Sequence, residues 1–184
     1  MINHAGSAGK NEVDFLKETE PDVKWYAIYV RSRFEKKVYA QLLQKNIETY
    51  LPLIEEVRLW SDRKKKVQEP LFKGYLFVRI NIKAKLSVLQ ADGVVKFVGI
   101  RDRPSAIPGD QINWIKIILH SADAIRKEKY PTMGERVEVV AGPLHGIQGI
   151  VSQVRGSTRL VILVDAISRA FSVEVQPEFL KAIA

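Results

Sequence analysis

The sequence of 184 residues contains no cysteine. This absence excludes disulfide bonds, zinc sites built on thiolates and catalysis by a thiol nucleophile. No run approaches the roughly 20 apolar residues that a membrane helix needs. Residues 1–23 are polar and mostly acidic, and they lack the basic start and apolar middle of a secretion signal. We therefore expect a cytoplasmic protein that makes no contact with a membrane and begins with a mobile tail over residues 1–23.

Histidine is also scarce, with only His4, His120 and His145 in the chain. We expect these side chains in the tail, at a helix end and in a turn, away from any serine or carboxylate pair that would activate a nucleophile or a water. The carboxylates near the C-terminus lack the spacing of metal ligands. The sequence therefore predicts no enzyme, no metal, no cofactor and no small-molecule substrate.

Charge, in contrast, is plentiful and unevenly distributed. The chain is 46% hydrophobic and 27% charged, and its length suits two small domains. Residues 24–123 carry 19 Lys and Arg against 10 Asp and Glu, whereas residues 130–184 carry five of each. A positive surface raises the local concentration of a polyanion. The first domain is thus predicted to attract nucleic acid, although a basic surface that is merely solvated would have the same composition.

Apolar and aromatic periodicity predicts alternating strands and helices in the first domain, residues 24–123. Strands are expected at 24–30, 49–52, 56–60, 75–80 and 94–100, and helices at 34–46, 83–90 and 108–121. This order resembles the ferredoxin-like plan with an inserted hairpin, whose charged tip is 61–66. The fold class is therefore α+β, an antiparallel sheet with helices on one face, followed by a second domain.

A polar segment containing Lys127-Glu-Lys-Tyr-Pro131 marks the domain boundary, with a linker over 124–133. Short apolar runs beyond it predict a small SH3-like β-barrel of about five strands over 134–184, ending near Phe179. Gly142, Gly146 and Gly149 superficially match a phosphate-binding loop, but the Gly-Lys-Ser/Thr ending and the following helix are missing. We expect a tight turn between strands there.

Several short motifs resemble a known family. Its N-terminal (NGN) pattern is carried by Trp25-Tyr26, Phe34-Glu35, Leu51-Pro52, Glu69-Pro-Leu-Phe72, Tyr75-Leu-Phe-Val78 and Val98-Gly99…Pro104, and its KOW pattern by Gly134…Val137…Gly142-Pro143…Gly146…Gly149…Val151. This combination resembles NusG-type transcription elongation factors over nearly everything after Val23. The run from Glu69 looks closer to RfaH-like and capsule-locus (UpxY-like) specialised paralogues, with Lys73 where the housekeeping factor usually has proline. Housekeeping and operon-specific roles both stay open.

The resemblance implies a binding surface for RNA polymerase. In the family, an exposed apolar concavity grips the clamp helices of the largest subunit, and the matching positions are Tyr29, Phe72, Tyr75 and Phe77. Aromatic side chains suit such an interface because they supply large contact areas at a low cost in entropy. Alternating strand positions point to opposite faces, so some of these rings could instead fill the core.

A cluster of cations follows the first strand. Arg31, Arg33, Lys36 and Lys37 lie within seven positions, and Gln41 is one turn further along the helix. The resemblance implies that this cluster meets the non-template single-stranded DNA of the transcription bubble, through contacts to phosphates and bases. The alternative for each cation is a solvated helix face. Likewise, the basic run 63–66 is either a solvated hairpin tip or a contact with upstream DNA or the polymerase lobe opposite the clamp.

The KOW pattern implies a second protein partner. Leu144, Ile167 and Arg169 match positions that dock either a small-subunit ribosomal protein or the termination helicase, although Ile167-Ser168 stands where relatives carry Phe-Gly. The helix 108–121 has two apolar stripes, so one stripe faces the sheet and the other is either buried or meets the KOW domain or a partner. The sequence predicts a non-enzymatic antitermination factor that suppresses pausing and termination. The alternative is an RNA-binding or ribosome-associated KOW protein that acts without polymerase. The zero net charge of residues 130–184 argues against this alternative, because a domain that binds RNA is expected to be basic.

Overall fold

The computed structural model describes residues 22–59, 64–101, 103–121, 125–128, 134–154 and 157–183. Most of the predicted tail with His4, residues 61–63 of the predicted hairpin tip, and residues 124 and 129–133 of the predicted linker lie outside the described residues. Among the described residues, no helix is long and apolar enough to cross a membrane.

The first sheet is antiparallel and has the strand order β2-β5-β1-β6, with β9 also paired to β1. Its strands are β1 (Val23–Val30), β2 (Glu48–Tyr50), β5 (Tyr75–Asn81), β6 (Val94–Phe97) and β9 (Ala106–Ile107). The central pair β1 and β5 aligns Tyr29 with Tyr75. Because directly opposed residues point to the same face, these two rings are neighbours at one end of the sheet.

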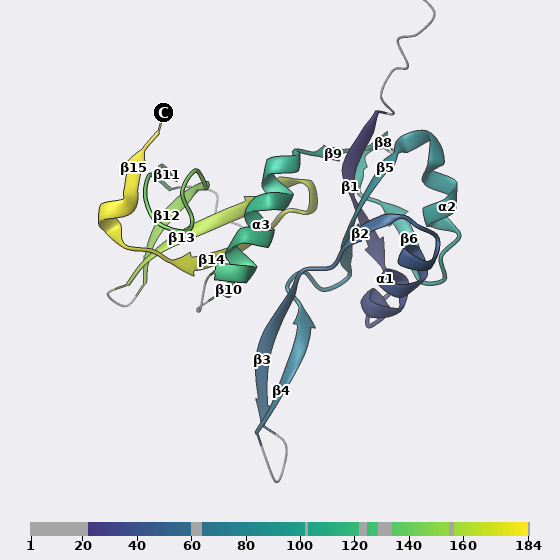
Figure 1. Ribbon diagram of the computed structural model, residues 1–184, viewed down its shortest axis with the longest axis horizontal. Coiled ribbons are helices and arrows are strands. Elements are labelled where there is room, and N and C mark those ends of the chain that lie inside the picture. The colour runs from purple at the N-terminus through teal and green to yellow at the C-terminus, as the bar shows by residue number, and fades with distance from the viewer. Residues whose placement is uncertain are drawn as a thin grey trace, which may run out of the picture.

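Both faces of the first sheet are covered, since its strands alternate two apolar sets. Tyr26 and Ile28 of β1 pack with helices α1 (Glu35–Gln44) and α2 (Lys85–Leu89), which a short 3₁₀ turn (Ile82–Ala84) precedes. Trp25 and Ala27 pack on the opposite face, where helix α3 (Gly109–Ser121) lies. The helix-covered face expected from the sequence is therefore present, and α3 adds a cover to the other face (Figure 1).

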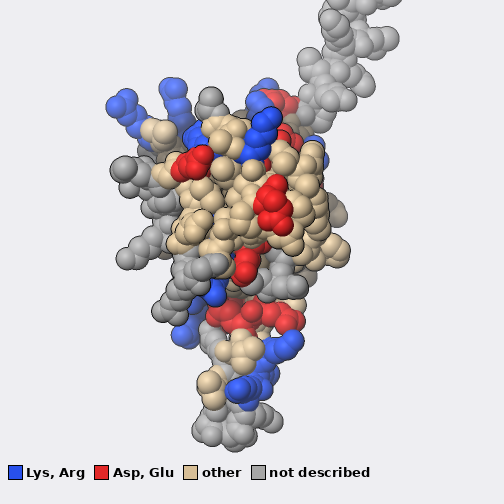
Figure 2. Space-filling view, turned by 90° about the vertical axis from the view of Figure 1, so that its left-hand side faces the viewer, with Lys and Arg blue, Asp and Glu red and all other residues tan. Residues whose placement is uncertain are grey.

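A two-stranded hairpin extends from the first sheet (Figure 1). It consists of β3 (Leu53–Leu59) and β4 (Lys64–Pro70), and a second small ribbon pairs β7 (Gly99–Ile100) with β8 (Arg103–Pro104). Figure 2 shows Lys and Arg gathered toward the far end of the hairpin, with an acidic band nearer the body. The exposed cations there include Lys64, Lys65 and Lys66, so charge and solvent exposure coincide at this end.

The second sheet is also antiparallel, in the order β10-β14-β13-β12-β11-β15. Its strands are β10 (Arg126–Glu128), β11 (Arg136–Val139), β12 (Gln148–Val154), β13 (Ser157–Val164), β14 (Arg169–Glu174) and β15 (Leu180–Ala182), with 3₁₀ turns at Asp165–Ile167 and Pro177–Phe179. The predicted glycine turn is confirmed for Gly142 and Gly146, at φ +79° and +82°, whereas Gly149 lies in β12. Strand β10 comes from the segment predicted as linker and adds a sixth strand, because its backbone pairs with β14.

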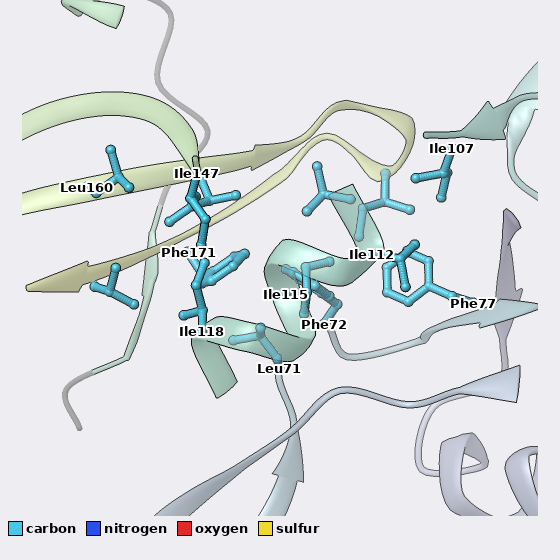
Figure 3. Packing of buried hydrophobic residues seen from close by; sticks show 14 of the residues in the cluster. Leu71, Phe72, Phe77, Ile107, Ile112, Ile115, Ile118, Ile147, Leu160 and Phe171 are labelled. Atoms are coloured by element: carbon cyan, nitrogen blue, oxygen red, sulfur yellow. The ribbon is translucent and has the colours of Figure 1, made fainter. Parts of the chain in front are cut away.

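One apolar core connects the two sheets through α3. The buried face of this helix carries Ile112, Ile115 and Ile118 at helical spacing. Figure 3 shows these side chains in one cluster with Phe72 and Phe77 of the first sheet's side and Phe171 of β14. Burying a side chain of this size contributes about 1.5–3 kcal/mol. The second sheet is therefore held against α3 and the first sheet by continuous packing.

Candidate functional site

Four aromatic side chains, which we call the aromatic face, lie at the positions predicted to bind polymerase: Tyr29, Phe72, Tyr75 and Phe77. The Tyr29 and Tyr75 ring centroids are 5.4 Å apart, and those of Phe72 and Phe77 are 6.1 Å apart in an edge-to-face arrangement. The fold therefore brings all four onto neighbouring strands and the turn before β5, as an aromatic surface requires.

The expectation of an exposed hollow is wrong for half of the aromatic face. Phe72 and Phe77 are only 3% and 0% exposed, whereas Tyr29 is 39% exposed and Tyr75 is half-buried. Phe171 of the second sheet lies edge-to-face on Phe72 at 5.9 Å, and α3 packs in the same cluster (Figure 3). The sequence could not reveal this burial, because the covering residues lie between about 40 (α3) and about 100 (Phe171) positions further along the chain.

A buried carboxylate holds the turn that carries the aromatic face. The Gly74 backbone N–H donates to Glu35 Oε1 at 2.8 Å, and Glu35 is 6% exposed. Gly74 has φ +81°, and a Cβ there would come within 3.0 Å of the Tyr29 ring. Glu35 thus ties the start of α1 to the aromatic turn. The sequence offered the Phe34-Glu35 motif as a signal, but it did not predict this positioning role.

The predicted nucleic-acid residues form a second surface, the basic ridge, at the end of β1 and along α1. It comprises Arg31, Arg33, Lys36, Lys37 and Gln41, of which the four cations are exposed and Gln41 is half-buried. Arg33 has φ +66°, a left-handed conformation that turns the chain from β1 into the helix. Lys36 Nζ donates to the Gln68 carbonyl at 2.8 Å, which links the ridge to β4.

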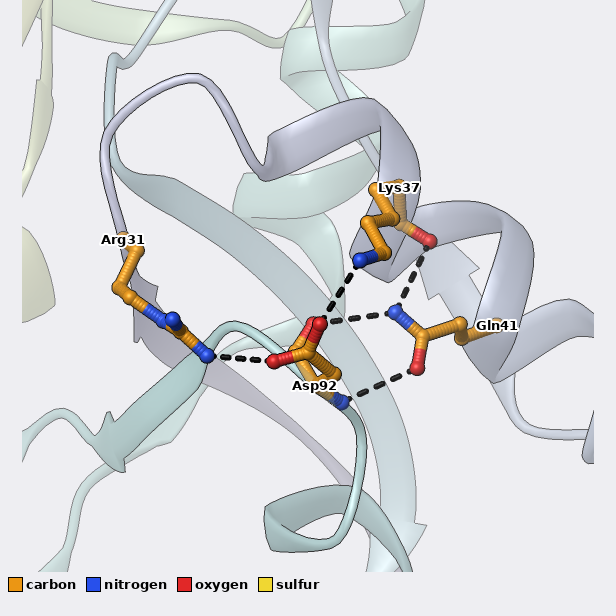
Figure 4. Close-up of polar contacts among 4 residues, drawn as sticks. All are labelled: Arg31, Lys37, Gln41 and Asp92. Atoms are coloured by element: carbon orange, nitrogen blue, oxygen red, sulfur yellow. Dashed lines mark hydrogen bonds and ion pairs between the residues drawn. The ribbon is translucent and has the colours of Figure 1, made fainter.

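Asp92, which the sequence did not single out, binds three residues of the basic ridge (Figure 4). Its carboxylate pairs with the guanidinium of Arg31 and, at 2.7 Å, with Nζ of Lys37. Its backbone exchanges two hydrogen bonds of 3.0 Å with the Gln41 amide. The hydrogen bond from Lys37, with the charges of Lys37 and Arg31, holds the pKa of Asp92 below its ordinary value.

The three residues expected to bind a partner through the second sheet differ in solvent exposure. Leu144 and Ile167 are buried at 9% and 4% exposure. Arg169 is exposed, and its guanidinium lies 5.8 Å from the centroid of the Tyr75 ring. Ile167, Arg169 and Tyr75 line one cleft of about 850 Å³. The two predicted protein-binding sites therefore face each other in this structure.

Two polar contacts accompany the apolar packing between the sheets. Gln111 of α3 donates to the Leu163 carbonyl of β13 at 2.9 Å. Lys127 of β10 and Glu56 of β3 form an ion pair of 2.6 Å, with both side chains 35% exposed. These contacts fasten the second sheet to α3 and to the middle of β3 in the hairpin.

Taken together, the fold is that of a NusG-like α+β protein, with helices on an antiparallel sheet and a small β unit beside it. A family model described as transcription termination factor nusG matches residues 23–116, just over half of the chain. The chain therefore belongs to the NusG family of transcription termination and antitermination factors.

Individual relatives agree with this membership. The transcription termination/antitermination protein NusG of Thermus thermophilus is 27% identical over 168 residues, covering 77% of this chain and 90% of the relative. The protein of the same name from Lactococcus lactis is 28% identical over 170 residues, covering 84% and 90%. A solved structure described as "Domain interaction in Thermotoga maritima NusG" has a TM-score of 0.53 and 20% identity, covering 88% of this chain and 98% of that one.

Proposed function

We propose that this chain is an elongation and antitermination factor that binds the clamp helices of the largest RNA polymerase subunit through the aromatic face. The observation that carries the proposal is the Tyr29–Tyr75 ring pair, which stays accessible at the edge of a continuous aromatic surface. Exposed tyrosines are frequent anchors of protein interfaces, because a large ring and a hydroxyl act together. Membership of the NusG family supports the same partner.

Binding through the whole aromatic face requires a change from the arrangement in Figure 1. Phe72 is covered by Phe171, so the second sheet must move away before Phe72 can meet a partner. We propose that residues 24–123 and 134–184 are separate domains, and that polymerase selects the state in which they part. A ligand that binds only this open state shifts the equilibrium toward it by mass action.

The basic ridge is proposed to contact the non-template single-stranded DNA of the transcription bubble. Arg31 and Lys37 supply charge for phosphates, and Gln41 supplies an amide that can bond base edges. The ridge starts at Arg31, two residues after Tyr29 and directly after the end of β1, so one protein surface would face polymerase and DNA together. Such a bridge would hold the transcription complex closed and suppress pausing and termination.

The second sheet is proposed to act as a KOW domain that recruits either a small-subunit ribosomal protein or the termination helicase. Of Leu144, Ile167 and Arg169, only Arg169 is exposed, and it faces Tyr75 across the cleft. The partner site would therefore become available when the two sheets part. This arrangement couples recruitment of the second protein to polymerase binding, because both need the same open state.

The direct test is the affinity of the full chain for RNA polymerase. Tyr75→Ala should weaken binding by about 30-fold, which corresponds to the loss of about 2 kcal/mol at an interface anchor. Leu86→Ala is the matched control, because Leu86 is 65% exposed on α2, which packs on the opposite face of the first sheet. Equal affinities for the wild type and Tyr75→Ala, or no binding by the wild type, would contradict the proposal. In transcription assays, the wild type should shorten pauses and Tyr75→Ala should not.

A further inference from the structure

Asp92 occupies the part of the basic ridge that nucleic acid would need. The contacts described above bring its carboxylate to Arg31 and Lys37 and its backbone to Gln41 (Figure 4). A carboxylate and a phosphate compete for the same guanidinium and ammonium groups, because both are oxyanions with charge-assisted hydrogen bonds. A nucleic acid strand therefore meets Arg31 and Lys37 already paired with a carboxylate.

The position of Asp92 is fixed by the backbone and by a ring beneath it. The Arg31 backbone N–H donates to the carbonyl of Gly93 at 2.8 Å. Gly93 has φ +106°, and a Cβ there would lie 2.6 Å from the Phe34 ring, so only glycine lets the chain pass this close. The Arg31 guanidinium and Lys37 Nζ lie 4.7 and 5.0 Å from the centroid of the same ring. The turn that carries Asp92 is thus built into the ridge.

We propose that Asp92 is a selectivity residue, an internal competitor that keeps the basic ridge from binding free nucleic acid and reserves it for DNA presented by the polymerase. This inference rests on the proposed DNA contact of the ridge. When a free strand displaces Asp92, a phosphate replaces a carboxylate on Arg31 and Lys37, so the strand gains little binding free energy. A strand held in place by the bound polymerase reaches a high effective concentration, and it can displace Asp92 without strong intrinsic affinity.

The competition has a measurable salt dependence. Removing the Asp92 charge raises the net positive charge available to phosphates by one. For single-stranded DNA, each additional phosphate neutralised steepens the slope of log K against log[salt] by about 0.7. Exposed ion pairs are individually weak, so the release of these two should tighten binding only about three- to tenfold.

The test compares the full-length wild type, Asp92→Asn and Glu48→Gln. Asp92→Asn removes the charge but keeps the backbone bonds to Gln41, which use the N–H and C=O groups. Glu48→Gln removes the same charge from an exposed ion pair with Arg79 of 3.2 Å, on strands β2 and β5 away from the ridge. Binding of a fluorescein-labelled 12-nucleotide oligodeoxythymidine is followed by anisotropy at several KCl concentrations.

We expect Asp92→Asn to bind about three- to tenfold tighter than the wild type, with a slope steeper by about 0.7, and Glu48→Gln to follow the wild type closely. If the wild type binds and Asp92→Asn matches Glu48→Gln, or binds more weakly, the inference is overturned while the proposed DNA contact stands. If neither the wild type nor Asp92→Asn binds, the inference is overturned, because Asp92 then holds back no affinity for free DNA. Binding by Asp92→Asn alone supports the inference in its strongest form.

Discussion

The aromatic face and the basic ridge lie side by side at one end of β1, but they are covered in different ways. Phe72 and Phe77 lie beneath an apolar interface that includes α3 and Phe171. In the ridge, Arg31 and Lys37 are paired with the exposed carboxylate of Asp92. An apolar interface opens cooperatively and at a large cost in free energy, whereas an exposed ion pair exchanges cheaply and depends on salt. On the proposed function, access to polymerase and access to DNA would therefore depend on free energies of different size.

The largest effect should come from removing a ring of the covered face. Phe72→Ala deletes a side chain that is 3% exposed and touches both Phe77 and Phe171. We expect the free energy of unfolding to fall by about 3–5 kcal/mol, from lost burial and the cavity left behind. Urea denaturation followed by tryptophan fluorescence measures the change. Leu59→Ala, at a side chain 80% exposed, should stay within about 0.5 kcal/mol of the wild type. Equal losses in the two variants would show that Phe72 is not covered.

A smaller effect is expected at Glu35, which connects the two surfaces. Glu35→Ala leaves the buried Gly74 N–H without its acceptor and should lower the free energy of unfolding by about 1–3 kcal/mol. Glu35→Gln keeps an oxygen that can accept the same hydrogen bond, so this variant should lower the free energy of unfolding by clearly less. The same denaturation assay gives both values. A Glu35→Gln loss as large as that of Glu35→Ala would contradict a role based on this hydrogen bond.

The contact between the sheets can be weakened through one ion pair. Lys127→Glu places two carboxylates together at the 2.6 Å contact with Glu56 and should destabilise the interface by up to about 1 kcal/mol. Hydrogen exchange of the β10 amides should become up to about fivefold faster. The charge swap Lys127→Glu with Glu56→Lys should restore slow exchange. Slow exchange in the single variant would mean that this pair does not fasten the second sheet.

The smallest effect concerns the ridge and its pH dependence. Lys37→Ala should raise the pKa of Asp92 more than Arg31→Ala does, because the hydrogen bond from Lys37 is the largest cause of the lowered pKa. Since the pKa of Asp92 is depressed in the folded chain, its contribution to stability is present above the ordinary value of about 3.9 and is lost as the pH falls through the lower folded value. NMR titration of the carboxyl group measures the order of the two shifts. The reverse order would assign the main contact to Arg31.

Local features of the molecule could be predicted from the sequence, but the covering contacts could not. Periodicity located β1, α1, β5 and α3 to within a few residues, because each has a clear apolar repeat. The residues of this chain that cover the aromatic face or pair with the basic ridge are distant in sequence from those surfaces. Asp92 lies 55 positions from Lys37, and no local pattern distinguishes it from any exposed aspartate.

The second apolar stripe of α3 indicates part of the packing between the two sheets. Two stripes on one helix indicate two packed surfaces, but they do not say whether the second surface is core or partner. In the structure, Ile112, Ile115 and Ile118 are buried between the sheets, whereas Ile117 is 39% exposed. The sequence predicts a linker where β10 lies, because the charged residues of this strand give no apolar alternation and its pairing with β14 depends on the backbone.

The most direct test of the account is the distance between the two sheets with and without RNA polymerase. The chain has no cysteine, so Leu86→Cys on α2 and Lys181→Cys on β15 accept spin labels at two exposed positions and nowhere else. Pulsed electron paramagnetic resonance should give one narrow distance distribution for the free protein. Saturating polymerase should replace it with a longer and broader distribution. An unchanged distribution in a complex with bound polymerase would contradict the claim that the second sheet leaves the aromatic face when polymerase binds.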